Sequence, residues 1–124
     1  MTDRIKRELA LVKSAYGEVD VDADLRWFVI RRWLLVAGWN KQHTRLLVVI
    51  PPGYPVTAPD NFFTDQDLRL DGDAMPGNAS VAQQAGESWL QFSYHLEGGE
   101  WQPEKGHDFL TFLAGVARRL REKS

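Results

Sequence analysis

The chain has 124 residues, of which 44% are hydrophobic and 26% are charged, and its formal net charge is -2. These values indicate one globular domain spanning residues 1–124 and exclude a disordered chain. The small negative charge predicts no binding to nucleic acid, and no apolar run is long enough to cross a membrane. Because the chain contains no cysteine, disulfides, thiolate metal ligands and a thioester formed by this chain are excluded.

The first half of the chain predicts one helix and three strands. Apolar residues fall on one stripe of residues 2–14, which is typical of an amphipathic helix. Residues 18–24 alternate apolar and acidic side chains and predict a short edge strand. Two β-rich runs at 25–38 and 44–52 are joined by a polar turn, which favours an antiparallel hairpin.

The second half of the chain contains a proline-rich turn at 51–59 and a short predicted strand at 61–64. Residues 65–86 are rich in Asp, Gly, Asn and Ser and predict a long irregular loop, a feature that is often functional. A further extended segment follows at 88–94, and an amphipathic helix is predicted at about 107–121. The fold class is therefore α+β, with an N-terminal and a C-terminal helix packed against an antiparallel β-meander.

Ser93 and His95 are the candidate chemical pair. At positions i and i+2 of an extended segment, both side chains would point to the same side, with Cα atoms about 6.5 Å apart. The imidazole would then be placed to take a proton from the hydroxyl or from an incoming nucleophile. The alternative is two polar residues on the solvent-exposed face of a strand.

Two of the five tryptophans are candidates for exposed positions. Trp39 lies beside the polar turn and Trp101 beside two glycines, and exposed tryptophans commonly anchor partners. For Trp101 the alternative is a packing role, in which the indole pins the preceding loop to the last helix.

The order of short motifs resembles the ubiquitin-conjugating (E2/UBC) fold. The motifs are Ile50-Pro51-Pro52-Gly53-Tyr54-Pro55, then Pro59, Phe62-Phe63-Thr64 and Trp101-Gln102-Pro103. The resemblance covers nearly the whole chain. It is closest to bacterial E2-like proteins encoded beside ubiquitin-like, E1-like and JAB-type peptidase genes, and it implies a UBC-like domain with a long active-site loop in a conjugation pathway. The expected location is cytoplasmic, because residues 1–16 lack the apolar core of a signal peptide.

The chain departs from the pattern of catalytic E2 enzymes at two places. These enzymes carry a cysteine eight residues before the Trp of Trp-x-Pro, and counting back from Trp101 leads to Ser93. The expected upstream His-Pro-Asn segment is also missing, because residues 66–70 are Gln-Asp-Leu-Arg-Leu. The resemblance therefore lacks both the usual thiol nucleophile and the usual oxyanion-stabilising amide.

Four interpretations remain open. Ser93, with His95 as base, would hold a ubiquitin-like C-terminus as an oxyester. Alternatively, the chain is a non-catalytic E2 variant that binds a ubiquitin-like protein or an E1 as an adaptor. A deliberate Cys→Ser or Cys→Ala change made to trap a complex is the third possibility. The fourth is a scaffold module unrelated to conjugation.

The expected partners are an E1-like enzyme, a ubiquitin-like protein and a JAB-type peptidase, with no nucleic acid, membrane, cofactor or metal. Arg4, Lys6 and Arg7 on the first predicted helix resemble the E1-contacting helix of E2 enzymes, although a solvated helix face would look the same. Tyr54 and Trp101 are further candidates for partner contact.

Overall fold

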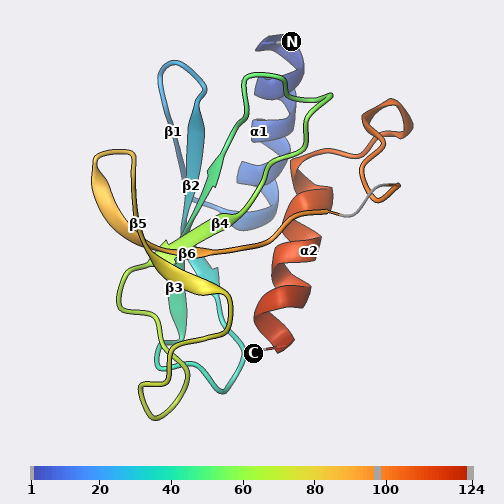
Figure 1. Cartoon of the computed structure of the whole chain (residues 1–124). Helices are drawn as coiled ribbons and strands as arrows, with labels where there is room; N and C mark the ends of the chain where they lie inside the picture. Colours follow the sequence, from blue (N-terminus) through green and yellow to red (C-terminus); the bar gives the residue numbers. More distant parts are fainter. Residues whose placement is uncertain (1, 97–98, 123–124) are drawn as a thin grey trace.

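The computed structural model describes residues 2–96 and 99–122 and places two helices against one face of a six-stranded antiparallel sheet (Figure 1). The elements are α1 (Thr2–Tyr16), β1 (Val19–Val21), β2 (Trp27–Leu34), β3 (His43–Val49), β4 (Phe62–Asp65), β5 (Ala79–Gln84), β6 (Glu87–Phe92), a 3₁₀ turn (Pro103–Lys105) and α2 (Phe109–Glu122). The strand order is β1-β2-β3-β4-β6-β5. This α+β arrangement confirms the predicted fold class, and none of the described helices has the length and apolar character needed to span a membrane.

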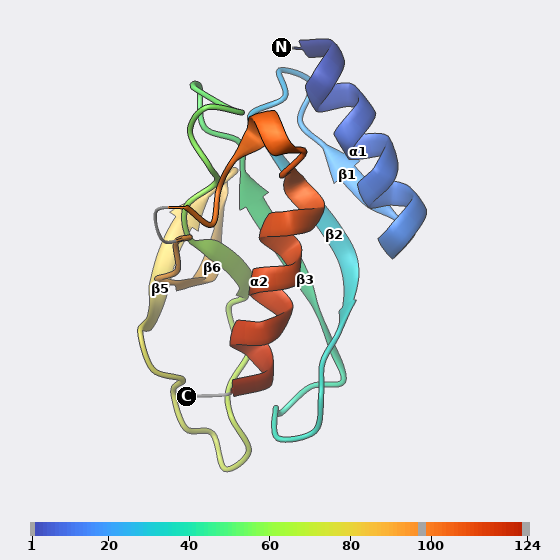
Figure 2. The same ribbon diagram turned by 90° about the vertical axis from the view of Figure 1, so that its right-hand side faces the viewer.

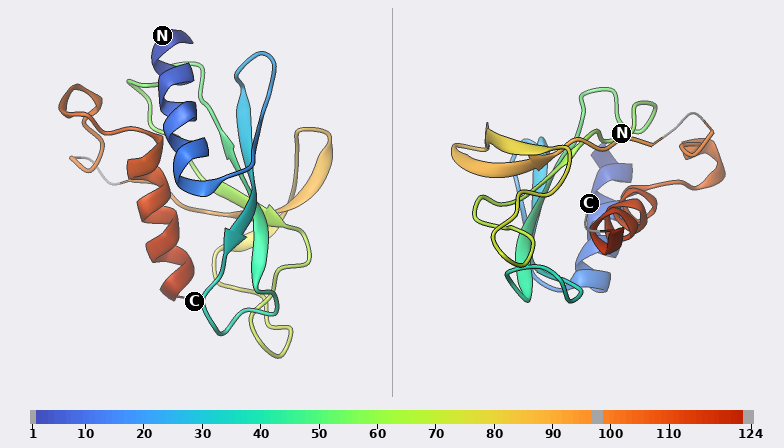
Figure 3. Two further views of the ribbon diagram at one scale, coloured as in Figure 1. Left: turned by 180° about the vertical axis from the view of Figure 1, so that it is seen from behind. Right: turned by 60° about the horizontal axis from the view of Figure 1, so that its bottom comes forward.

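The helices bury the stripes that the sequence periodicity predicted. Leu9 and Val12 of α1, and Phe112 and Val116 of α2, are buried against the sheet. Figures 2 and 3 show both helices on the same side of the sheet, with α2 lying across its middle strands. Asp108 begins α2 with a reciprocal cap, because its carboxylate accepts from the Thr111 N–H at 3.1 Å and its own N–H donates to the Thr111 hydroxyl at 3.1 Å.

Alternation along the strands creates a second, smaller apolar cluster on the face away from the helices. Leu90 and Phe92 of β6 belong to the helix-side core, whereas Trp89 of the same strand packs with Val29 and Leu47 on the opposite face. The guanidinium of Arg45 lies 4.3 Å from the centre of the Trp89 ring. The sheet is therefore apolar on both faces, which explains the near-continuous hydrophobic runs in the sequence.

The strand β5 was missed by the sequence prediction of one loop over residues 65–86. It is joined to β6 by Ala85 and Gly86, whose φ angles of 49° and 79° match a two-residue hairpin turn. Residues 79–84 contain one β-branched residue and show no apolar alternation, because backbone pairing with β6 rather than burial holds them. The sheet also differs from a simple meander, since β6 returns between β4 and β5.

Trp39, a candidate for an exposed position, is buried. Its side chain is 5% exposed, and its indole N–H donates to the carbonyl of Leu120 at 3.0 Å. The ring also meets Phe92 edge-on, with ring centres 6.2 Å apart. Trp39 therefore anchors the turn after β2 to the end of α2, because a buried indole needs both apolar neighbours and an acceptor.

Candidate functional site

Ser93 lies at the end of β6 on a backbone that is held from both sides. Its N–H donates to the carbonyl of Asn78 at 2.8 Å, and the N–H of Tyr94 donates to the side-chain oxygen of Asn61 at 3.0 Å. The side chains of Phe92 and Tyr94 belong to or pack against the helix-side core, so alternation directs Ser93 outward on the other face. Ser93 is exposed, as the prediction of a reactive hydroxyl requires.

Asn61 is a positioning residue that the sequence prediction did not include. It has a positive φ of 62°, a conformation that asparagine tolerates better than most side chains. From this position it makes two hydrogen bonds with the backbone of Tyr94. Its N–H donates to the Tyr94 carbonyl, and its side-chain oxygen accepts from the Tyr94 N–H. The only sequence signal was an asparagine after Pro-Asp, which by itself indicates a turn and nothing more. His95 follows directly and is exposed.

Tyr54 is buried, which differs from its predicted role as a surface contact. The residue is 3% exposed, and its ring stacks on Phe109 with ring centres 4.4 Å apart. Its hydroxyl donates to the carboxylate of Glu8. Burial raises the pKa of this hydroxyl, and the neighbouring carboxylate raises it further, so the group remains a donor. A role of Tyr54 in partner binding stays a prediction that would act through the turn it fixes.

Trp101 joins the proline-rich turn to the segment before α2. Its indole N–H donates to the carbonyl of Pro55 at 2.7 Å, and its ring lies 5.8 Å from that of Tyr54. Trp101 thus has a packing role, but it fixes the proline-rich turn rather than the loop named in the prediction. Its half-buried ring leaves the predicted partner contact open. The next segment turns back on itself, since the N–H of Gln102 donates to Nδ1 of His107 at 2.9 Å.

Glu8 is a buried carboxylate at the point where α1 meets the start of α2. It is 6% exposed and accepts from Nε of Arg4 at 2.7 Å and from the N–H of Phe109 at 3.0 Å, in addition to the hydroxyl of Tyr54. A carboxylate in this place satisfies one of the free N–H groups of α2 and complements its dipole. Sequence reasoning missed Glu8 because one acid on a helix carries no signal of burial.

The three predicted basic residues of α1 separate into two environments. The guanidinium of Arg4 is held by Glu8 and by the carbonyl of His107 at 2.9 Å, and the hydrogen bond to Glu8 raises the pKa of Arg4. Lys6 and Arg7 are exposed. Arg4 thus links α1 to the segment before α2, whereas Lys6 and Arg7 are positioned as an exposed basic pair.

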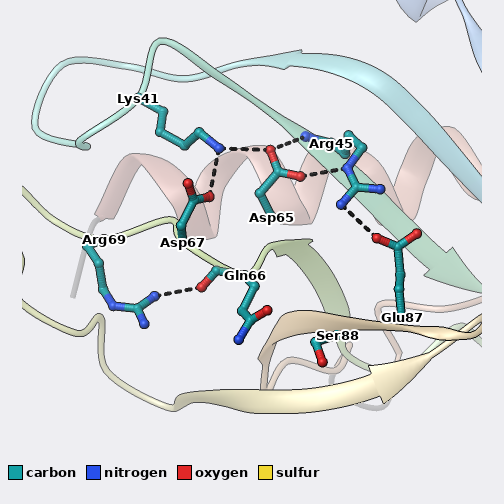
Figure 4. Close-up of a pocket in the computed structure, with 8 residues that line it drawn as sticks. All are labelled: Lys41, Arg45, Asp65, Gln66, Asp67, Arg69, Glu87 and Ser88. Carbon is teal, nitrogen blue, oxygen red and sulfur yellow. Dashed lines mark hydrogen bonds and ion pairs between the residues drawn. The ribbon is translucent and has the colours of Figure 1, made fainter.

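A charged cluster occupies the other face of the sheet and surrounds an open pocket of about 730 Å³ (Figure 4). The charged residues of this cluster are Lys41, Arg45, Asp65, Asp67, Arg69 and Glu87. Asp65 is at its centre, 3.1 Å from Nζ of Lys41 and 2.6 Å from Nε of Arg45. Burial would raise the pKa of Asp65, but the hydrogen bonds from Arg45 and Lys41 outweigh it and lower that pKa.

The charged cluster lies apart from Ser93. It includes Glu87 at the start of β6, and Ser93 follows the end of that strand, a separation of about 20 Å at the usual rise per residue. The segment 66–70 that replaces His-Pro-Asn therefore lines a different site from the candidate nucleophile. Three cations and three carboxylates share this cluster, so it has no net charge to attract an ion of either sign.

A protein-family model for prokaryotic E2 family E matches residues 3–123, which is almost the whole chain. The chain belongs to prokaryotic E2 family E. Membership indicates an E2-like role in a ubiquitin-like conjugation pathway and, in general terms, contact with E1-like and ubiquitin-like proteins. No curated protein and no solved structure gives a match. For this family E chain, the position of Ser93 eight residues before Trp101 becomes the main question about mechanism.

Proposed function

We propose that this family E protein receives a ubiquitin-like C-terminus from an E1-like enzyme and holds it as an oxyester on Ser93. The main support is that Ser93 is exposed on a backbone held by hydrogen bonds. The N–H of Ser93 donates to the carbonyl of Asn78, and the N–H of the next residue, Tyr94, donates to the side chain of Asn61. An acyl carrier needs a nucleophile that is accessible to a large partner and does not move. The family match over residues 3–123 supplies the substrate class.

The proposed transfer is an acyl exchange onto the hydroxyl of Ser93. Oγ of Ser93 attacks the activated carbonyl carbon of the ubiquitin-like C-terminus, and its proton passes to the imidazole of His95. The bond between that carbon and the leaving group of the E1-like enzyme then breaks, and the leaving group takes the proton from His95. A base is required because a serine hydroxyl is a weak nucleophile at neutral pH.

Intact-mass analysis after incubation with E1-like enzyme, ATP and the ubiquitin-like protein tests the proposal. The expected adduct survives thiol reductant, is cleaved by hydroxylamine and is lost in Ser93→Ala. Ser93→Cys is the matched control, since a thiol at the same position should give an adduct that reductant removes. His95→Ala should slow adduct formation by about 10²- to 10⁴-fold. An adduct that persists in Ser93→Ala would show that the acceptor is elsewhere.

The alternative function is a non-catalytic E2 variant that binds a ubiquitin-like protein or an E1 as an adaptor. It is favoured by the absence of cysteine from the chain and by the replacement of His-Pro-Asn at residues 66–70. In the same experiment this alternative predicts no adduct in the natural chain, together with retained partner binding in Ser93→Ala. Contact with a JAB-type peptidase stays a prediction of the resemblance, and a cytoplasmic location stays a prediction from the sequence.

A further inference from the structure

The two edges of the sheet differ in how they are protected against pairing. The β1 edge is three residues long, and Arg31 clamps the carboxylates of Glu18 and Asp20 beside it, with N–O distances of 2.6 and 2.7 Å. Short strands and charged side chains are common devices that block edge-to-edge association. The β5 edge is six residues long and has no charged residue, no proline and an unbroken register with β6. Figure 2 shows β5 at the open side of the sheet.

The hydrogen bonds of β5 with β6 determine which of its backbone groups point away from the sheet. Ser93 donates to the carbonyl of Asn78, so this pair is hydrogen-bonded. Hydrogen-bonded pairs alternate along an antiparallel ladder, and Ser80, Ala82 and Gln84 therefore bond to β6. The N–H and C=O groups of the residues between them point outward. These residues are Ala79, Val81 and Gln83, and within the described part of the chain their outward groups have no backbone partner.

The outward-facing residues form a self-complementary set. A two-fold axis at Val81 would place Val81 opposite its copy and Ala79 opposite Gln83 of the other chain, so every outward N–H would meet a C=O. Because β5 has no charged side chain, no like charges would face each other across this axis. The side chain of Val81 is 49% exposed, and pairing would cover it.

We infer that the β5 edge is the dimerisation surface of this protein and that its occupant is the β5 edge of a second copy. Pairing through two β5 edges is isologous and closes after two chains. Pairing of β5 with β1 would give an open-ended filament, and the acidic, clamped β1 edge opposes it. The joined sheet would leave both Ser93 hydroxyls on one face, so the dimer is compatible with the proposed function and does not depend on it.

Sedimentation equilibrium tests the association. One strand pair buries less area than the interface of a permanent dimer, so we expect a dimer dissociation constant on the order of 10 μM. The mass should rise from 14.2 kDa towards twice this value with concentration. Val81→Pro removes an outward N–H that β6 does not use, and it should keep the chain monomeric with an unchanged circular-dichroism spectrum. Val81→Thr is the matched control and should still dimerise, while Val81→Lys should separate the copies by charge without the backbone change.

Cross-linking tests the register. Because the chain has no cysteine, an introduced cysteine is the only thiol that a short bis-maleimide can modify. Val81→Cys should cross-link in high yield, whereas two copies of Gln83→Cys would lie about 14 Å apart and should not. The inference would be overturned if the natural chain stays monomeric at concentrations on the order of hundreds of micromolar. It would be overturned equally if this monomeric chain binds an added extended peptide. A dimer that persists in both Val81→Pro and Val81→Lys, or equal cross-linking at the two positions, would also overturn it.

Discussion

Glu8 is a buried carboxylate whose partners come from three parts of the chain. Arg4 is one turn away on α1, Tyr54 is in the proline-rich turn and Phe109 begins α2. A buried carboxylate without such partners would be strongly destabilising, whereas one with a cation, a hydroxyl and a helix N-terminus around it is compensated. Glu8 therefore explains why the Tyr-Pro turn and the start of α2 are packed together.

Replacing Glu8 should reduce stability sharply. Glu8→Ala leaves Arg4 without its carboxylate partner and the N–H of Phe109 without its acceptor, so we expect a loss of about 3 kcal/mol in the free energy of unfolding. Urea denaturation followed by tryptophan fluorescence measures this loss. Glu104→Ala, on the exposed 3₁₀ turn, is the control and should change the free energy by less than about 0.5 kcal/mol. Similar losses in the two variants would contradict the role given to Glu8.

Among the elements, α2 is positioned by its contact with the segment that follows β6. Gly115 lies where a Cβ atom would overlap the hydroxyl of Tyr94, and the Tyr94 ring packs against Phe62 and Phe112 with centres 5.9 and 5.7 Å apart. The helix can approach the sheet this closely only because position 115 has no side chain. The same contact holds the backbone next to Ser93.

Gly115→Ala should therefore reverse the usual effect of this substitution. In a helix interior, Ala is commonly more stable than Gly by about 1 kcal/mol, but overpacking against Tyr94 should make this variant less stable by about 1–3 kcal/mol. Adding Tyr94→Phe removes the overlapping hydroxyl and should restore part of the loss. Thermal unfolding of the single and double variants gives both values. A stabilised single variant would show that α2 is free to shift away from the sheet.

Across the whole molecule, three segments named in the sequence analysis gather at one end. The start of α1, the proline-rich turn and the Trp101 segment lie together there, as the hydrogen bonds from Arg4 to His107 and from Trp101 to Pro55 require (Figure 2). Lys6 and Arg7 are exposed at this end. The charged cluster of β3, β4 and β6 is on the opposite face of the sheet from the helices and would be free while a partner docks.

Charge reversal on α1 tests whether this end receives the E1-like enzyme. Lys6→Glu with Arg7→Glu should weaken binding by at least tenfold in a titration that uses the complete chain and the E1-like enzyme, because rim charges steer association. Lys13→Glu makes the same type of change near the other end of α1 and should have little effect. Unchanged affinity in the double variant would remove α1 from the docking surface, and the circular-dichroism spectra establish that all variants are folded.

The elements with strong periodicity and the order of the motifs could be predicted from the amino-acid sequence alone. Both helices and the strands at residues 27–34, 43–49, 62–65 and 87–92 follow from their apolar and β-rich patterns. The Tyr-Pro turn and the Trp101-Gln102-Pro103 motif pointed to the E2 family. The burial of Glu8 and the open edge formed by β5 became apparent only in the folded structure, whereas the edge strand at 18–24 was predicted. Glu8 is held by Tyr54 and Phe109, which lie 46 and 101 positions away, and Asn61 by Tyr94, 33 positions away. The strand β5 is held by pairing with β6, beginning between Gln84 and Glu87. Strand pairing through the backbone, and the burial of a polar side chain whose hydrogen bonds are satisfied, do not require a regular spacing of apolar residues. The sequence therefore contains no periodic signal for them.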